Sequence, residues 1–146
     1  MDISARIRIL AGITRGSVYY FEDGDLSSTE PHYFIVLNKN PKTEEVVILA
    51  CASSQVEKRK QVAQRLGFSA ETLVIVLPDE YKEFTKETVI DCNRVFEKSA
   101  ETLIEKLNQG KLRVCTEQMP EKVVKKMIVG ILASNQVSKN IQSMLG

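Results

Sequence analysis

Short apolar runs define the strands that this chain is expected to form. Runs rich in β-branched and aromatic residues predict strands over residues 18–21, 33–37, 46–51, 72–77, 88–90 and 112–116. The second and third runs are apolar at every position, which indicates strands buried on both faces of a closed or covered sheet. The polar turn residues 38–43 lie between them, so this pair should form a hairpin.

Helical signals lie between and beyond the strands. A short helix is expected within residues 4–11. Ser54 begins an S-x-x-E capping box, which predicts a helix over residues 55–66 with Gly67 just past its end. Apolar residues at spacings of three and four predict a further helix over residues 100–107.

The last helix carries the broadest apolar stripe. Pro120 suits its first turn, and apolar positions recur from Val123 to Leu132. Beyond Asn135 the stripe shifts, so the helix should bend, break or fray there. This order of elements does not supply the regular βαβ crossovers of a doubly wound parallel sheet. The expected class is therefore α+β, with a small β-barrel, an inserted helix and a long C-terminal helix.

The composition is that of one folded domain. A chain of 146 residues with 43% apolar and 27% charged residues fits a single domain over residues 1–146, in which residues 1–14 are a short N-terminal helical extension. A net charge of +1 gives no global attraction to nucleic acid, so a nucleic-acid site must be a local basic patch. No segment approaches the ~20 apolar residues of a membrane span. We expect a soluble, cytoplasmic protein.

The cysteine and histidine content argues against a metal site. The three cysteines, Cys51, Cys92 and Cys115, are widely separated, and no C-x-x-C pair occurs. With His32 as the single histidine, the usual zinc-ligand spacings are absent. An odd number of cysteines without a disulfide framework suits a reducing cytoplasm. We expect no metal and no cofactor.

Five segments, in order, resemble the MazF/PemK family of bacterial toxins. The first is the aromatic strand segment 15–21, and the second, residues 32–38, is similar to a family strand that begins R-P and ends V-L-(S/N). Residues 52–55 stand where the family has a short T-S or T-A element. Residues 87–95 are similar to an element that contains D-Q-x-R, and residues 99–134 follow the family's order of helix, Gly, polar turn and long helix. The order and spacing of the five segments carry the resemblance.

The resemblance implies a fold, an activity and partners. Members of the family are SH3-like barrels that form dimers, and active members are endoribonucleases that need no metal. Their active sites lie in grooves beside the dimer interface, and an antitoxin peptide holds them inactive. By resemblance, this chain is a toxin that cleaves single-stranded RNA, forms a homodimer and binds an antitoxin protein.

Three residues are catalytic candidates by this resemblance. Metal-free RNA cleavage needs a base, an acid and groups that stabilise the phosphorane. Asp91 matches the aspartate of the D-Q-x-R element, and Ser53 matches a hydroxyl residue near the scissile phosphate. His32 stands where active members carry an arginine, and an imidazole can do acid or base chemistry near neutral pH. Two of them also have a structural interpretation: Asp91 can be a turn or cap residue, and His32 can be the relic of a lost arginine.

Four further residues are expected to contact RNA. Asn93 and Arg94 belong to the D-Q-x-R-like element, and Arg94 can bind phosphate or form a structural ion pair. Lys58 and Arg59 lie on the polar face of the inserted helix, which is either a solvated surface or a basic patch for RNA. The strand aromatics at 19–21 either stack on bases or pack in the core.

Two other functions stay open. Positions 32 and 89 lack arginines that active members carry, which favours a barrel that has lost catalysis and binds a partner protein. The set His32, Ser53 and Asp91 favours the enzyme. The CcdB toxins share the barrel fold and bind a topoisomerase, but their activity depends on a C-terminal Trp-Gly-Ile, and this chain has no tryptophan. The first prediction is therefore a metal-independent endoribonuclease of a toxin–antitoxin pair.

Overall fold

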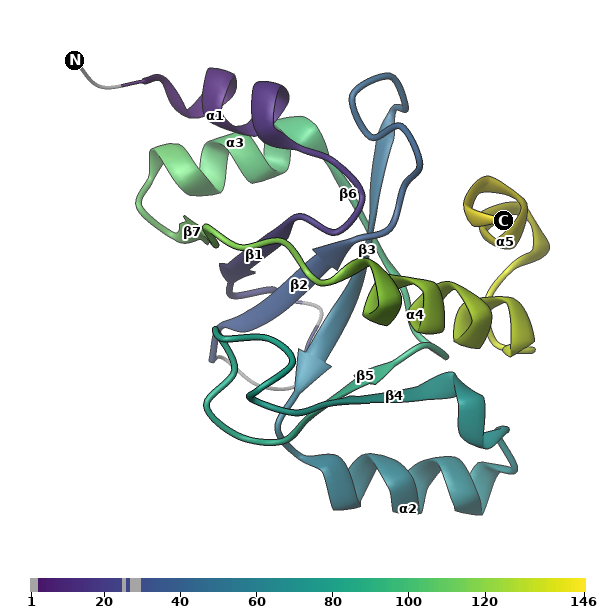
Figure 1. The fold of residues 1–146 in the computed structure, drawn as a ribbon. Helices are drawn as coiled ribbons and strands as arrows, with labels where there is room; N and C mark the ends of the chain where they lie inside the picture. Colours follow the sequence, from purple (N-terminus) through teal and green to yellow (C-terminus); the bar gives the residue numbers. More distant parts are fainter. Residues whose placement is uncertain (1–2, 25, 27–29) are drawn as a thin grey trace.

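In the computed structural model, which describes residues 3–24, 26 and 30–146, seven antiparallel strands form one sheet (Figure 1). In chain order the elements are α1 (Ala5–Gly12), β1 (Val18–Phe21), β2 (His32–Val36), β3 (Val46–Ser53), α2 (Val56–Leu66), η1 (Ala70–Thr72), β4 (Leu73–Val76), β5 (Thr88–Asp91), β6 (Phe96–Ser99), α3 (Ala100–Asn108), β7 (Leu112–Val114), α4 (Glu121–Ala133) and α5 (Lys139–Leu145). The strand order is β4-β5-β3-β2-β1-β7, and β6 pairs with β3 off this path. The α+β class is confirmed.

The strand β3 holds the sheet together. Its first half pairs with β6, where Leu49 faces Phe96, and its end pairs with β5, where Ser53 faces Val89. Its other edge pairs with β2, which confirms the predicted hairpin. Beyond β2, the strand β1 pairs with β7, so the first strand of the sheet lies beside the last.

The sheet is open, so the closed barrel expected from the sequence is not seen. Within the described residues, β4 and β7 end the strand order and do not pair with each other. A barrel needs every strand edge to be paired. What the structure supports is an open antiparallel sheet whose faces are covered by helices.

Both faces of the sheet are covered, as the apolar runs predict. Phe34 of β2 packs in a cluster with Ile9 of α1 and Leu103 of α3. Its neighbour Ile35 points to the other face and packs in a cluster with Met127 of α4. Figure 1 shows α1 and α3 on one side of the central strands, with α4 and α5 on the other. Because successive side chains of a strand alternate between faces, a strand covered on both faces is apolar at every position.

The C-terminal helix is divided, which corrects the expectation of one long helix. The helix α4 has 13 residues, and α5 follows after a break that contains Asn135. The sequence prediction of a bend, break or fraying at this point is confirmed. In the described part of the chain, no helix is long and apolar enough to cross a membrane.

The start of α2 differs from the predicted capping box. The helix begins at Val56 with Gln55 as its N-cap, and no side chain caps it, so Ser54 does not have the predicted role. Instead, the hydroxyl of Ser53 accepts a hydrogen bond from the backbone N–H of Gln55 at 3.1 Å. The predicted end is confirmed, because Gly67 lies at φ 76° in the left-handed region that favours glycine.

The packing of α4 depends on the absence of a side chain at Gly130. A Cβ at this position would lie 2.6 Å from the backbone oxygen of Glu71 and 3.1 Å from the Cβ of Cys92. We expect Gly130→Ala to lower the free energy of unfolding by about 1–3 kcal/mol, because α4 must move away from η1 and the sheet. Urea denaturation followed by circular dichroism measures the change.

A matched control lies in α1. A Cβ at Gly12 would meet no atom within 4 Å, so Gly12→Ala should leave the stability unchanged or raise it by up to ~1 kcal/mol. Equal unfolding free energies for Gly130→Ala and the wild type would show that α4 does not pack as closely as the structure has it.

Candidate functional site

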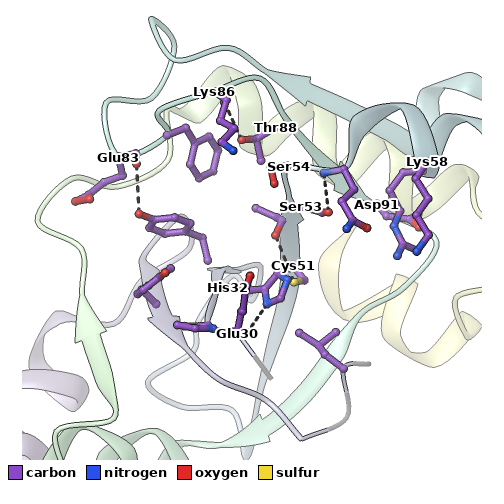
Figure 2. Close-up of a pocket in the computed structure, with 18 of the residues that line it drawn as sticks. Glu30, His32, Cys51, Ser53, Ser54, Lys58, Glu83, Lys86, Thr88 and Asp91 are labelled. Carbon is purple, nitrogen blue, oxygen red and sulfur yellow. Dashed lines mark hydrogen bonds between the residues drawn. The ribbon is translucent and has the colours of Figure 1, made fainter. Parts of the chain in front are cut away.

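A pocket of about 500 Å³ opens where β3 ends and α2 begins. It brings together six of the seven residues singled out from the sequence, which are His32, Ser53, Lys58, Arg59, Asp91 and Arg94. They come from β2, β3, α2, β5 and the turn after β5. Figure 2 shows His32, Ser53 and Asp91 around the same space.

Strand register explains why the three catalytic candidates meet. In the β2–β3 register Phe34 faces Cys51. Continued by two residues, this register brings His32 beside Ser53. In the β3–β5 register Ala52 faces Ile90, and continued by one residue this register brings Asp91 beside Cys51. Because residues two apart on a strand share a face, all of these side chains lie on one face of three neighbouring strands.

The hydrogen bond of His32 settles which ring atom is available to a ligand. Its Nδ1 lies 2.9 Å from the backbone oxygen of Glu30. A carbonyl oxygen only accepts, so Nδ1 carries the proton of this bond. The atom Nε2 is then the ring nitrogen that can exchange a proton with a bound molecule.

Ser53 has a hydroxyl hydrogen, and Asp91 a carboxylate oxygen, that can bond to a ligand. The Ser53 hydroxyl accepts from the N–H of Gln55, and this bond leaves its own hydrogen to be donated. On Asp91, the backbone N–H and the side-chain amide of Asn93 both donate to Oδ1, each at 3.0 Å. The second carboxylate oxygen, Oδ2, is therefore the one suited to accept a proton.

Cationic side chains line the pocket. Lys58 and the half-buried Arg59 come from the first turns of α2, whose N-terminal backbone N–H groups favour an anion. Arg94 lies over the ring of Phe96, with its Cζ 4.6 Å from the ring centroid, and Lys86 comes from the loop before β5. Guanidinium and ammonium groups, together with a helix N-terminus, suit a phosphate.

Aromatic side chains form another wall. The rings of Tyr20 and Tyr33 lie 4.5 Å apart, and Phe84 meets Tyr33 edge to face at 5.3 Å. All three rings line the pocket. The flanking strand aromatics Tyr19 and Phe21 are 2% and 1% exposed, so only the middle member of the predicted aromatic run reaches the pocket.

The loop before β5 contributes site residues that no sequence motif predicts. Glu83, Phe84 and Lys86 from this loop line the pocket. The loop is held by Arg113 of β7, whose guanidinium lies 3.2 Å from the Glu83 carboxylate, and by the Tyr33 hydroxyl, which donates to the Glu83 backbone oxygen at 3.3 Å. These are tertiary contacts, and no local periodicity in the loop predicts them.

Cys51 lies on the pocket floor as an unreactive thiol. Burial raises its pKa to about 12, and the smaller effects of Arg94 and Arg59 in the opposite direction do not offset this. Since the thiolate is the reactive form of cysteine, this side chain serves as lining and not as a nucleophile.

Asn93 is the exception among the predicted site residues, and its expected contact with RNA is not supported. It is 9% exposed and does not line the pocket. Its side chain bonds inside the protein to Thr72, Asp91 and Ser134. A single polar turn residue gives no sequence signal of the side to which it points, so the burial of Asn93 is not predictable from the sequence.

Comparisons with known proteins add no family assignment. No family model matches the chain, and no curated protein matches it either. Within the described residues, no group of three or more His, Cys, Asp or Glu side chains is placed to hold a metal ion. The function must therefore be argued from the pocket itself.

Proposed function

We propose that this pocket binds single-stranded RNA and cleaves it without a metal ion, and that the protein is the toxin of a toxin–antitoxin pair of the MazF/PemK type. The observation that carries the proposal is the convergence of His32, Ser53 and Asp91 on one pocket with four cationic side chains. These residues were selected from short motifs far apart in the sequence. Their meeting in space supports a shared role.

The chemistry needs one proton acceptor and one proton donor. Asp91 Oδ2 takes the proton of the RNA 2′-hydroxyl, whose oxygen attacks the neighbouring phosphorus. His32, in its protonated form, gives the Nε2 proton to the departing 5′-oxygen as the P–O bond breaks. The products are a 2′,3′-cyclic phosphate and a free 5′-hydroxyl. Groups positioned as acid and base each contribute ~10²–10⁴ in rate.

The remaining lining residues suit the rest of an RNA strand. Lys58, Arg59 and Arg94 neutralise the phosphate, and the Ser53 hydroxyl donates to a phosphate oxygen. The aromatic wall offers faces for bases, which stack on tyrosine and phenylalanine in many single-strand binding proteins. The proposal also includes the family's homodimer, antitoxin partner and cytoplasmic location.

The charge of the lining favours a second candidate, a non-catalytic pocket that binds a partner protein. Four cationic side chains are balanced by three carboxylates in the pocket wall, which are Lys58, Arg59, Lys86 and Arg94 against Glu30, Glu83 and Asp91. A purely basic groove would bind RNA more strongly than this mixture. A peptide with both signs of charge would fit it as well.

Incubation with a long single-stranded RNA in excess EDTA separates the two candidates. The proposal expects discrete fragments with 2′,3′-cyclic phosphate ends, and a DNA of the same sequence, which lacks the 2′-hydroxyl, should stay intact. Fragments are mapped by primer extension and their ends by mass spectrometry. Intact RNA across several sequences, with protein shown to be folded, would favour the protein-binding pocket.

A further inference from the structure

A chain of hydrogen bonds runs through the protein from α5 to the pocket. The side-chain amide of Gln142 donates to the backbone oxygens of Ile131 and Ser134, each at 2.8 Å. The hydroxyl of Ser134 donates to Oδ1 of Asn93 at 2.8 Å. The amide of Asn93 in turn donates to Oδ1 of Asp91 at 3.0 Å.

The direction of these bonds explains the choice of asparagine. The Asp91 carboxylate, when ionised, only accepts hydrogen bonds, so the residue that holds Oδ1 must be a donor. Ser134 gives its hydroxyl hydrogen to Asn93, so Asn93 must present an acceptor on that side. The amide of Asn93 meets both demands, and its nitrogen also donates to Oγ1 of Thr72 at 2.8 Å. An aspartate at position 93 would place an acceptor against the carboxylate of Asp91.

Burial makes this arrangement rigid. Asn93, Ser134 and Gln142 are 9%, 5% and 7% exposed. A buried polar group that loses its partner cannot form a hydrogen bond with water instead. Each hydrogen bond therefore holds the side chain that it joins in one orientation. Gln142 fixes the last turn of α4, which places Ser134, which in turn places Asn93.

We propose that Asn93 and Ser134 are positioning residues for the carboxylate of Asp91, and that the corner between α4 and α5 is thereby part of the active site. The inference rests on the proposed function. With Oδ1 held by two donors from Asn93, the carboxylate keeps one rotation and presents Oδ2 to the 2′-hydroxyl. A proton acceptor displaced by about 1 Å loses up to ~10²-fold in rate.

Single-turnover cleavage by two variants tests the proposal. Asn93→Asp should lower the rate of RNA cleavage ~10–100-fold, and Ser134→Ala should lower it by a smaller factor. Binding of a 2′-O-methyl RNA of the same sequence, which lacks the attacking hydroxyl, should hardly change. Asn140→Ala and Ser143→Ala, two exposed positions on α5, are the matched controls and should leave both measurements unchanged.

A double-mutant cycle separates positioning from general damage to the fold. If Asn93 and Ser134 act through Asp91, adding either variant to Asp91→Asn should cause no further loss in rate. Additive losses would overturn the proposal. So would wild-type rates for both variants alongside an impaired Asp91→Asn, and that result would leave the proposed function intact.

An NMR measurement tests positioning without RNA. Three-bond couplings about χ1 of Asp91 should report one rotamer in the wild type and in Ser143→Ala, and averaging over several rotamers in Ser134→Ala. Ser134→Ala keeps an asparagine at position 93 and introduces no new charge, so it serves if Asn93→Asp does not fold. A single rotamer in all three proteins overturns the proposal. Averaging in Ser134→Ala alone supports it, even if the wild type proves unable to cleave RNA and the proposed function falls.

Discussion

Asp91→Asn should lower the rate of RNA cleavage by ~10²–10⁴-fold and leave the fold intact, because it removes the proposed base. The amide keeps an oxygen that can accept from the two N–H groups of Asn93, so the local hydrogen bonds survive. It has no basic oxygen to take the proton of the 2′-hydroxyl. Single-turnover kinetics on a fluorescent RNA measure the loss, and thermal unfolding checks the fold.

Asp79→Asn is the matched control for this change. Asp79 is exposed in the turn after β4 and does not line the pocket. The same loss of one negative charge there should leave the rate close to that of the wild type. A wild-type rate for Asp91→Asn would remove Asp91 from the mechanism and leave His32 and Ser53 as the catalytic candidates.

His32→Ala should lower the rate by ~10²-fold or more, because the departing 5′-oxygen loses its proton donor. The pH dependence should change with it. A histidine acid makes the wild-type rate depend on the protonation of the imidazole, and the alanine variant should lack that dependence. Rates measured at a series of pH values, with unfolding followed at each pH, give the comparison.

His32→Arg decides whether the histidine is an acid or a relic. In the MazF/PemK family, which the sequence resembles, active members carry an arginine at the corresponding position. It holds its proton near neutral pH, so it can stabilise a phosphate but is a poor proton donor. An impaired arginine variant supports an imidazole acid, whereas a raised rate identifies His32 as the remnant of a lost arginine. Equal rates for wild type, alanine and arginine would show that His32 takes no part.

The elements predicted best were those with strong local patterns. In the hairpin of β2 and β3, the runs 33–37 and 46–51 are apolar at every position and are joined by turn residues. Gly67 marks the end of α2 through its own conformational freedom. The strand β6 was missed because only Phe96 of its four residues is buried, which leaves no period of two to detect. Its pairing with β3 is a tertiary contact that local propensity does not encode.

In the candidate site, too, local sequence patterns predict some features and tertiary contacts determine the rest. Side-chain type and motif order select His32, Ser53 and Asp91, and the registers of β3 with β2 and with β5 bring them together in the structure. The loop carrying Phe84 has no periodic pattern, and its position depends on the pairing of Glu83 with Arg113. Sequence patterns find residues that carry chemistry, but the partners that hold them come from distant parts of the chain.

The pairing of β1 with β7 sets the order in which this chain can fold during synthesis. Tyr20 of β1 faces Arg113 of β7, so this contact closes a loop that contains most of the chain, and closure of that kind is slow. Arg113 also lies over the ring of Tyr20 and holds Glu83, so a pocket wall stays unfinished until β7 leaves the ribosome. The hydrogen bonds that Ser134 and Gln142 donate form later still, when α4 and α5 emerge. A nascent chain that has not yet exposed β7, α4 and α5 therefore lacks both a complete pocket and the contacts that hold Asp91.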